Sequence, residues 1–455
     1  MTKRFEIAVE EWISEESSDP QIQATAAEIS IKVGPYCATE VEDRRAKTVR
    51  KSIRASAALL ATWLLSNWWR LRWEPSKEPN RLDYLDWELS HSLPATGGGY
   101  VWPPLTFESD GSNILLRCEG QAKSDRAELS PIRYLNSFTE NISASSFESS
   151  ITKFVEQLLE RLNSTGVRRS LLHELWAETM IERNDPERTS QRKLEALLGL
   201  DPDEDESLVK DLLRRWQHRV GRGALEEIAA ATESASVERD LGAAEQAAES
   251  METLAEIPNV TGLRRLLGMG LSMNGMVPWQ RGRQAAYIVR EEWGFGMRPI
   301  PTKALADRLQ VLTSDLMGEQ PKTPFSFAVR GNTDEKFGMV LGRTHAHSRR
   351  FDVARLIGDH IIFETDDAWK PATRSLTARQ KFQRAFAAEF LCPSDELVKR
   401  FDGPIELDDL DDVTSSVSEE YNVSQKLVLN HFANRNLIPH LGSDGQSGFV
   451  NHAAY

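Results

Sequence analysis

Residues 349–363 read RRFDVARLIGDHIIF, and residues 378–393 read ARQKFQRAFAAEFLCP. In the first run, Val353, Ile357 and Ile361 recur at intervals of four residues, which is typical of the buried face of an α-helix. In the second run, Phe386 and Phe390 show the same interval. We therefore expect two helices whose apolar sides belong to the core of one domain.

The two runs together resemble the ImmA/IrrE family of bacterial metallo-endopeptidases, whose corresponding text is close to RRFTLAHELGHLLLH followed by ExEANxFAAELLMP. In that family two histidines one helical turn apart bind zinc, and the Glu between them activates a water molecule. The corresponding positions of this chain are Arg355, Leu356 and Asp359. The family's third ligand is a Glu just before FAAELLMP, but residues 378–388 contain no carboxylate. The resemblance therefore implies a zinc-peptidase fold without catalytic residues, metal or other cofactor.

The former ligand positions Arg355 and Asp359 lie one helical turn apart, and this leaves two arrangements open. The two side chains form an ion pair that fills the old metal cavity, or both point into water. We expect Arg355, Leu356, Asp359 and His360 to mark a groove that binds a protein partner without cleaving it. This interpretation predicts that Arg355→Ala or Asp359→Ala weakens the complex and leaves thermal stability nearly unchanged.

The resemblance extends over residues 278–438. Two short strands are expected at residues 325–329 and 337–341, around a turn segment that contains Gly331 and Asn332. Ser424 is expected to cap a last helix. The order and spacing of these elements agree with the family, which implies a mostly helical domain with a small sheet.

The first part of the chain is rich in Trp, since seven of the twelve tryptophans lie between Trp12 and Trp102. Strands are expected at residues 5–12 and 26–33, followed by one long helix from about Asp43 to Trp69. Basic residues at the start of this helix, between Arg44 and Arg54, could follow a phosphate backbone. A core helix with a solvated basic end is the favoured interpretation, because the whole chain is acidic.

These patterns predict an α+β protein with four parts. Residues 1–140 form a mixed α/β N-terminal domain, and residues 141–230 form a helical segment. Residues 231–258, rich in Ala, Glu and Ser, form a linker or a solvated helix. Residues 259–455 form the degenerate ImmA/IrrE-like, or zincin-like, domain.

Composition narrows the class of protein further. The 455 residues carry a net charge of −14, with a pI near 5.3, which opposes a general nucleic-acid or anionic-membrane binder. The three cysteines, Cys37, Cys118 and Cys392, are too scattered for a disulfide framework and indicate a reducing compartment. No apolar stretch has the length of a signal peptide or a membrane span. We therefore expect a cytoplasmic protein without a membrane partner.

Three functions are compatible with this sequence. The first is a catalytically dead pseudo-peptidase that binds and regulates a protein. The family resemblance implies a repressor or a component of a mobile-element or phage-defence system as its partner. The second is an enzyme with replaced chemistry. Arg355 and His360 have the R-x4-H spacing of HEPN ribonucleases, and His345, His347, Asp359 and His360 are a conceivable metal site.

Such short patterns arise easily by chance, so ordinary loop and helix-face histidines are the favoured interpretation of this second set. The third function is a nucleic-acid-associated regulator that uses residues 44–54 or the last helices. It is disfavoured, because residues 406–420 next to the last helix carry seven acids and no Lys or Arg.

Overall fold

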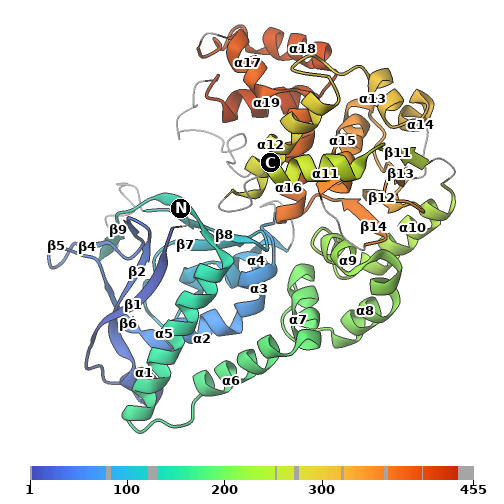
Figure 1. The fold of residues 1–455 in the computed structure, drawn as a ribbon. Helices are drawn as coiled ribbons and strands as arrows, with labels where there is room; N and C mark the ends of the chain where they lie inside the picture. The colour runs from blue at the N-terminus through green and yellow to red at the C-terminus, as the bar shows by residue number, and fades with distance from the viewer. Residues whose placement is uncertain are drawn as a thin grey trace. The chain divides into compact units, whose positions relative to one another are not determined.

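The computed structural model describes residues 3–77, 83–120, 131–251, 254–270, 276–318, 322–362, 367–401 and 403–438. Phe363 of the first motif and residues 439–455 of the predicted C-terminal domain lie outside the described residues. The chain divides into two compact units, Met1–Lys210 (unit 1) and Asp211–Tyr455 (unit 2). Each unit combines helices with small antiparallel sheets, so the protein is α+β, as the sequence predicts (Figure 1).

Unit 1 contains three small sheets. The first has the strands β1 (Phe5–Trp12), β2 (Ala26–Val33), β3 (Tyr36–Cys37) and β6 (Ile53–Ser56). The second has β7 (Leu105–Ser109), β8 (Asn113–Cys118) and β10 (Phe138–Ser143), and the third has β4 (Val41–Asp43), β5 (Thr48–Arg50) and β9 (Ile132–Tyr134). The predicted strands 5–12 and 26–33 are confirmed as β1 and β2.

The helices of unit 1 cover these sheets. They are α1 (Pro20–Ala24), α2 (Ala57–Ser66), α3 (Trp68–Trp73), α4 (Tyr84–His91), the 3-10 helix η1 (Leu93–Thr96), α5 (Ala144–Ser164), α6 (Leu171–Asn184) and α7 (Pro186–Leu198). The apolar face of α5 enters the core, where the ring of Phe147 stacks on Phe5 of β1 with centroids 6.2 Å apart. Helix α5 therefore lies directly beside the first strand.

The predicted long helix from Asp43 to Trp69 is wrong. Residues 41–56 form β4, β5 and β6, and the helix begins only at Ala57. The carboxylate of Asp43 accepts hydrogen bonds from the backbone N–H groups of Arg45 and Ala46, and Lys47 has a φ of 54°. An Asp that binds its own neighbouring N–H groups favours a turn over a helix, so the basic residues lie on the β4–β5 hairpin and on the chain that leads from it into β6.

Unit 2 contains one antiparallel sheet and most of the helices. Its strands, in spatial order, are β11 (Leu254–Glu256), β13 (Lys336–Val340), β12 (Ser326–Arg330) and β14 (Trp369–Ala372). Helix α8 (Glu206–Val220) runs across the boundary between the units. The other helices are α9 (Arg222–Ala229), α10 (Val237–Glu249), α11 (Val260–Gly270), α12 (Pro278–Glu292), α13 (Thr302–Arg308), α14 (Thr313–Met317), α15 (Ala346–Ile362), α16 (Ala378–Leu391), α17 (Ser394–Arg400), α18 (Leu410–Tyr421) and α19 (Gln425–Asn434).

Several predictions for this region are confirmed. The two quoted runs form α15 and α16, and Val353, Ile357, Ile361, Phe386 and Phe390 are all buried in one core. The predicted short strands are β12 and β13. The side chain of Ser424 caps α19.

The segment predicted as a linker or a solvated helix, residues 231–258, contains a packed helix, while its residues 252 and 253 lie outside the described residues. Helix α10 buries Val237, Leu241, Ala244 and Ala247 along one side. Their spacing of three and four residues makes a narrow stripe, and small alanines allow the helix to approach its neighbours closely. The Ala-rich composition therefore reflects a packed helix.

Glycines set how closely the helices of the unit 2 core approach one another. A methyl group on Gly282 of α12 would overlap the backbone carbonyl oxygen of Phe382 in α16. A methyl group on Gly358 of α15 would overlap the ring of Phe386. Helix α16 is therefore held between α12 and α15 at distances that only glycine permits.

We expect Gly282→Ala to lower the free energy of unfolding by about 1–3 kcal/mol, because the new methyl group meets backbone and no flexible side chain. Urea unfolding followed by circular dichroism measures the change. Gly242→Ala in α10 is the matched control, since a methyl group there meets nothing within 4 Å. The control should gain about 0.5–1 kcal/mol from the better helix former. Equal stability of Gly282→Ala and the parent would contradict this packing.

Candidate functional site

The positions that the family resemblance assigns to the active site are buried. The exposed fractions are 3% for Arg355, 0% for Leu356, 0% for Asp359 and 2% for His360. The expectation that these side chains present a binding groove is therefore wrong, as is the alternative that they point into water. Leu356 belongs to the apolar core, while the other three form polar contacts inside unit 2.

Arg355 does not pair with Asp359. Its guanidinium reaches Asp352 Oδ1 at 3.4 Å and donates to the carbonyl oxygen of Thr373 at 2.7 Å. It also donates to the side-chain oxygen of Gln380 in α16. Burial lowers the pKa of Arg355, and the carboxylate of Asp352 partly offsets this effect.

Asp359 instead binds Arg379 of α16. The guanidinium donates to both carboxylate oxygens, from Nε at 2.8 Å and from Nη2 at 2.7 Å. The side-chain amide of Gln383 donates to Asp359 Oδ1 at 2.9 Å. Burial by itself would raise the pKa of Asp359, but Arg379 and Gln383 outweigh it and hold the pKa below its ordinary value. The predicted pair within one helix is thus replaced by a bidentate pair between two helices.

The network continues from Arg379 to a second carboxylate. Arg379 Nη1 lies 3.2 Å from Asp367 Oδ2, and Asp367 Oδ1 accepts from the backbone N–H of Gly223 at 3.0 Å. Glu227 of α9 accepts from the hydroxyl of Thr377 at 2.6 Å. The polar centre therefore links α15, α16, the segment before β14 and the start of α9.

Polar side chains also occupy the outer edge of β14. This strand pairs with β12 on one side, and its opposite side faces α16. There the carbonyl oxygen of Pro371 accepts from Gln380 and Gln383, both at 3.0 Å. The N–H of Thr373 donates to Gln380 at 2.9 Å, and its carbonyl oxygen accepts from Arg355. These backbone groups are satisfied internally, so they cannot pair with an added peptide strand.

The histidines do not gather at this centre. His345 and His347 are exposed around the start of α15, while His360 is buried against the ring of Phe337, with centroids 4.3 Å apart. His360 Nε2 donates to the carbonyl oxygen of Asp334 at 2.8 Å. The structure therefore does not bring together the metal site considered from the sequence, and the buried R-x4-H pair cannot reach an RNA substrate.

Several residues of the polar centre were not identified from the sequence. Arg379, Asp367 and Glu227 come from three separate segments, and no spacing rule relates them. Burial raises the pKa of Glu227, and the charge of Arg379 partly offsets the rise. Burial and the nearby charge of Arg355 lower the pKa of Arg384 to about 9. Both pKa shifts arise because several charged side chains are buried close together in unit 2.

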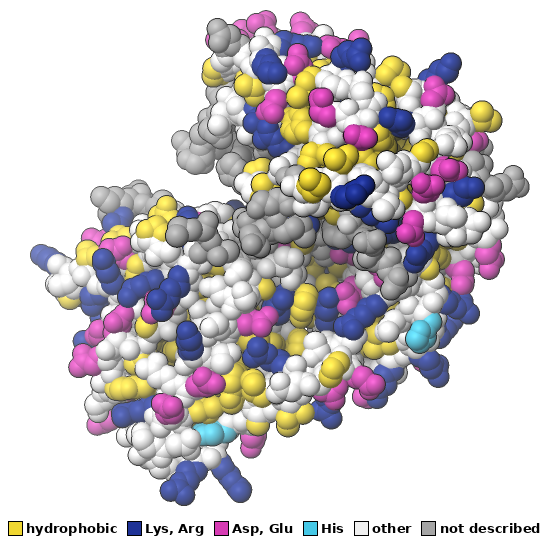
Figure 2. Space-filling view, in the orientation of Figure 1, with side chains coloured by type: hydrophobic (Ala, Val, Ile, Leu, Met, Phe, Trp, Pro, Cys, Tyr) yellow, Lys and Arg dark blue, Asp and Glu magenta, His cyan; other side chains and the backbone are white. Residues whose placement is uncertain are grey.

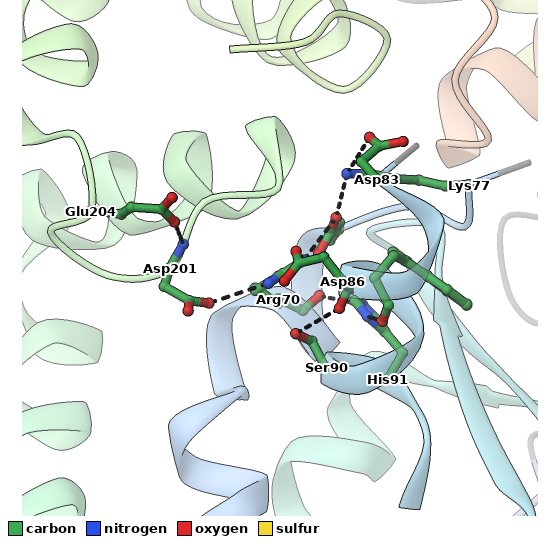
Figure 3. Close-up of polar contacts among 10 residues, drawn as sticks. Arg70, Lys77, Asp83, Asp86, Ser90, His91, Asp201 and Glu204 are labelled. Carbon is green, nitrogen blue, oxygen red and sulfur yellow. Dashed lines mark hydrogen bonds and ion pairs between the residues drawn. The ribbon is translucent and has the colours of Figure 1, made fainter. Parts of the chain in front are cut away.

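Unit 1 contains a second polar centre, around Arg70 of α3 (Figure 3). Arg70 is 2% exposed and binds Glu74 at 2.7 Å, Asp86 of α4 at 2.7 Å and Asp201 at 3.3 Å. Burial alone would lower the pKa of Arg70, but the carboxylates of Glu74 and Asp86 outweigh it and raise the pKa. The guanidinium thus fastens α4 and the loop after α7 to α3.

His91 lies at the inner end of this centre. Its Nδ1 lies 2.7 Å from the carbonyl oxygen of Trp87, and its Nε2 lies 3.3 Å from that of Arg70. Burial lowers the pKa of His91, and the charge of Glu74 partly offsets this effect. Its close partners belong to α3, α4 and Glu74 at the end of α3, whose Oε2 lies 3.8 Å from Nε2, and this indicates a structural role.

Comparisons with known proteins give no relative: no family model matches, and neither does any curated protein or solved structure. In the described part of the chain, no group of three or more His, Cys, Asp or Glu side chains is placed to hold a metal ion. No helix among the described residues has the length and apolar character needed to cross a membrane.

We expect Asp359→Ala to lower the free energy of unfolding by about 3–5 kcal/mol, because it leaves the guanidinium of Arg379 buried with one partner fewer. Urea unfolding of the purified variant measures the loss. Asp211→Ala is the control, since it removes a surface ion pair with Arg214 whose side chains are 50% and 75% exposed. The control should change stability by less than about 0.5 kcal/mol. A small loss for Asp359→Ala would restore the original expectation that this carboxylate is exposed.

The buried His360 predicts a pH dependence of stability. Burial, followed by the charge of Lys370, lowers its pKa to about 4, compared with about 6.5 in the unfolded chain. Its stabilising contribution is therefore complete above pH 6.5 and is lost as the pH falls toward 4. When His360 is fully protonated, the free energy of unfolding has fallen by about 3 kcal/mol.

Unfolding of the parent and of His360→Gln at pH 7 and pH 4.5 isolates this contribution. Gln retains an N–H donor for Asp334 and cannot gain a proton, so the variant should lose less stability on acidification. His91 and His431, whose pKa values are also lowered by burial, remain in both proteins and cancel in the comparison. Identical acid sensitivity of the two proteins would show that His360 is not buried in its neutral form.

Proposed function

We propose that this chain is a catalytically inactive, ImmA/IrrE-like pseudo-peptidase that acts as a protein-binding regulatory factor. The observation that carries this proposal is the convergence of both sequence motifs on one buried centre. Arg355 contacts Gln380, and Asp359 contacts Gln383, so the two ligand-bearing segments of the resemblance lie side by side. Ion pairs and amide hydrogen bonds stand where a peptidase would need metal ligands.

The chemistry of these side chains favours a role without hydrolysis. A guanidinium cannot donate a lone pair to zinc, and Leu356 cannot act as a base. Both oxygens of Asp359 are engaged by Arg379, and one also accepts from Gln383. The centre therefore supports the fold, and binding must use other surfaces of the molecule. The partner class that the resemblance implies is a repressor or a component of a mobile-element or phage-response system.

Nucleic acid is less well supported as the partner. Within the basic segment 44–54, Arg50 of β5 pairs with Asp43 at 3.3 Å, and Arg54 of β6 pairs with Glu28 at 3.0 Å. Figure 2 shows Lys and Arg side chains interspersed with Asp and Glu over the face that it draws. Mixed charge of this kind does not provide the continuous positive surface that a phosphate backbone requires.

We expect the full chain, purified after expression in zinc-supplemented medium, to contain far less than one zinc ion per chain. Elemental analysis measures the content. The triple variant Arg355→His, Leu356→Glu, Asp359→His should still lack proteolytic activity, because Gln380 and Gln383 provide no carboxylate. Adding Gln383→Glu should give zinc binding if the resemblance describes the geometry, since residue 383 already contacts residue 359.

Two results would contradict the proposal. One is stoichiometric zinc in the parent that disappears in Asp359→Asn. The other is cleavage of a partner that is captured by the parent chain, detected by mass spectrometry of the recovered protein. Recovery of a specific partner in uncleaved form would support the binding role. Circular dichroism of each variant establishes that loss of structure does not explain its zinc content.

A further inference from the structure

The outer edge of β1 in unit 1 is open along part of its length. Strand β1 pairs with β2 on one side and is the terminal strand of its sheet. The N–H of Gly34 donates to the carbonyl oxygen of Arg4 at 2.8 Å, which fixes the direction of the backbone groups along the strand. In an antiparallel pair these directions alternate. The backbone N–H and C=O groups of Arg4, Glu6 and Ala8 therefore face β2, and those of Phe5, Ile7 and Val9 face outward, as far as the β-bulge between Val9 and Glu11.

The outward groups of β1 differ from one end of the strand to the other. The N–H of Phe5 lies 3.4 Å from the hydroxyl of Ser146 in α5, and its carbonyl oxygen accepts from Ser150. Ile7 and Val9 have no such contacts: among the described residues, their outward N–H and C=O groups find no hydrogen-bond partner. Two consecutive outward positions are therefore available to a peptide backbone.

A hollow lies beside these open positions. It has a volume of about 390 Å³ and is lined on one side by Arg4 and by residues 5–9 of β1. The other side is α5, which contributes Ser146, Ser150, Lys153 and Gln157, spaced by three or four residues along one face of the helix. This wall contains hydroxyl, amide and ammonium groups and no carboxylate.

The charge in the hollow favours an acidic occupant. Arg4 and Glu6 lie 3.6 Å apart and largely cancel each other. Lys153 is exposed and has no carboxylate partner among the residues that the structure describes. One uncompensated positive charge therefore faces the space in which an added strand would lie.

We propose that the groove between β1 and α5 binds an extended segment of a partner protein that adds to β1 as a further strand and places an acidic side chain at Lys153. The segment exchanges backbone hydrogen bonds with Ile7 and Val9, and the contacts of Phe5 with α5 close the groove at one end. The site belongs to unit 1 and does not depend on the peptidase resemblance of unit 2. It gives the protein-binding role a location and a partner chemistry.

Selection of a random dodecapeptide library on the full-length chain, followed by fluorescence anisotropy with the enriched peptides, tests this site. We expect peptides with alternating β-branched residues and an Asp or Glu. Val9→Pro removes an outward N–H that makes no bond within the sheet, so it should preserve the fold and weaken binding by at least about tenfold. Val9→Thr is the matched control, because it keeps the N–H and the β-branched shape, and it should bind like the parent.

Lys153→Glu provides a second, independent test on the exposed surface of α5. It should weaken the binding of acidic peptides by about tenfold and leave the midpoint of thermal unfolding unchanged. This variant decides the outcome if Val9→Pro proves unstable. The proposal is overturned if no peptide is enriched, or if the enriched peptides bind Lys153→Glu as tightly as the parent. It is also overturned if sedimentation shows a dimer of the parent that Val9→Pro dissociates, because the occupant is then a second copy of this chain.

Discussion

A carboxylate without contact with water must have a cationic or hydrogen-bonding partner, and in unit 2 the Asp359–Arg379 pair meets this requirement. Asp359 has no exposed surface, and both of its oxygens bind the guanidinium. Arg379 then engages Asp367, which in turn holds the N–H of Gly223. Gly221, whose φ is 96°, lies close to Asp367, and a Cβ atom at this position would overlap the Asp367 side chain, so only glycine fits here. One buried pair thus determines how α9 and α16 meet α15.

The same contacts determine what the centre can and cannot do. Metal ligands need free lone pairs, and an added peptide strand needs free backbone groups. Here Arg379 and Gln383 occupy the lone pairs of Asp359, while Gln380 and Arg355 occupy the outer edge of β14. The side chains that stabilise this centre therefore oppose both metal coordination by Asp359 and strand addition at Pro371 and Thr373.

The sequence was informative where a local pattern determines the structure. The four-residue intervals of Val353, Ile357 and Ile361 predicted α15, and β1 and β2 were predicted with their observed bounds. It failed where the partner is distant in the chain. Arg355 and Asp359 have the spacing of a helical pair, but Asp359 binds Arg379 on another helix, and Arg355 contacts Gln380 on that helix and Asp352 on its own. Only tertiary packing decides between such partners.

Two further features could not be predicted from residue types alone: the hairpin between β4 and β5, and the difference between the edges of β1 and β14. The basic run after Asp43 has a composition that suits a helix, but the side chain of Asp43 binds local N–H groups and ends that possibility. Likewise, β1 and β14 are both terminal strands; Pro371 marks β14 as an edge strand, but no residue type shows whether a helix covers that edge. The difference comes from the neighbouring helix: α16 provides Gln380 and Gln383 along β14, whereas α5 provides serines only at Phe5. An unpaired strand edge is normally blunted or covered, because it otherwise pairs with other chains. The open stretch at Ile7 and Val9 ends at a β-bulge between Val9 and Glu11, and it is the part of β1 at which we propose that a partner strand is added.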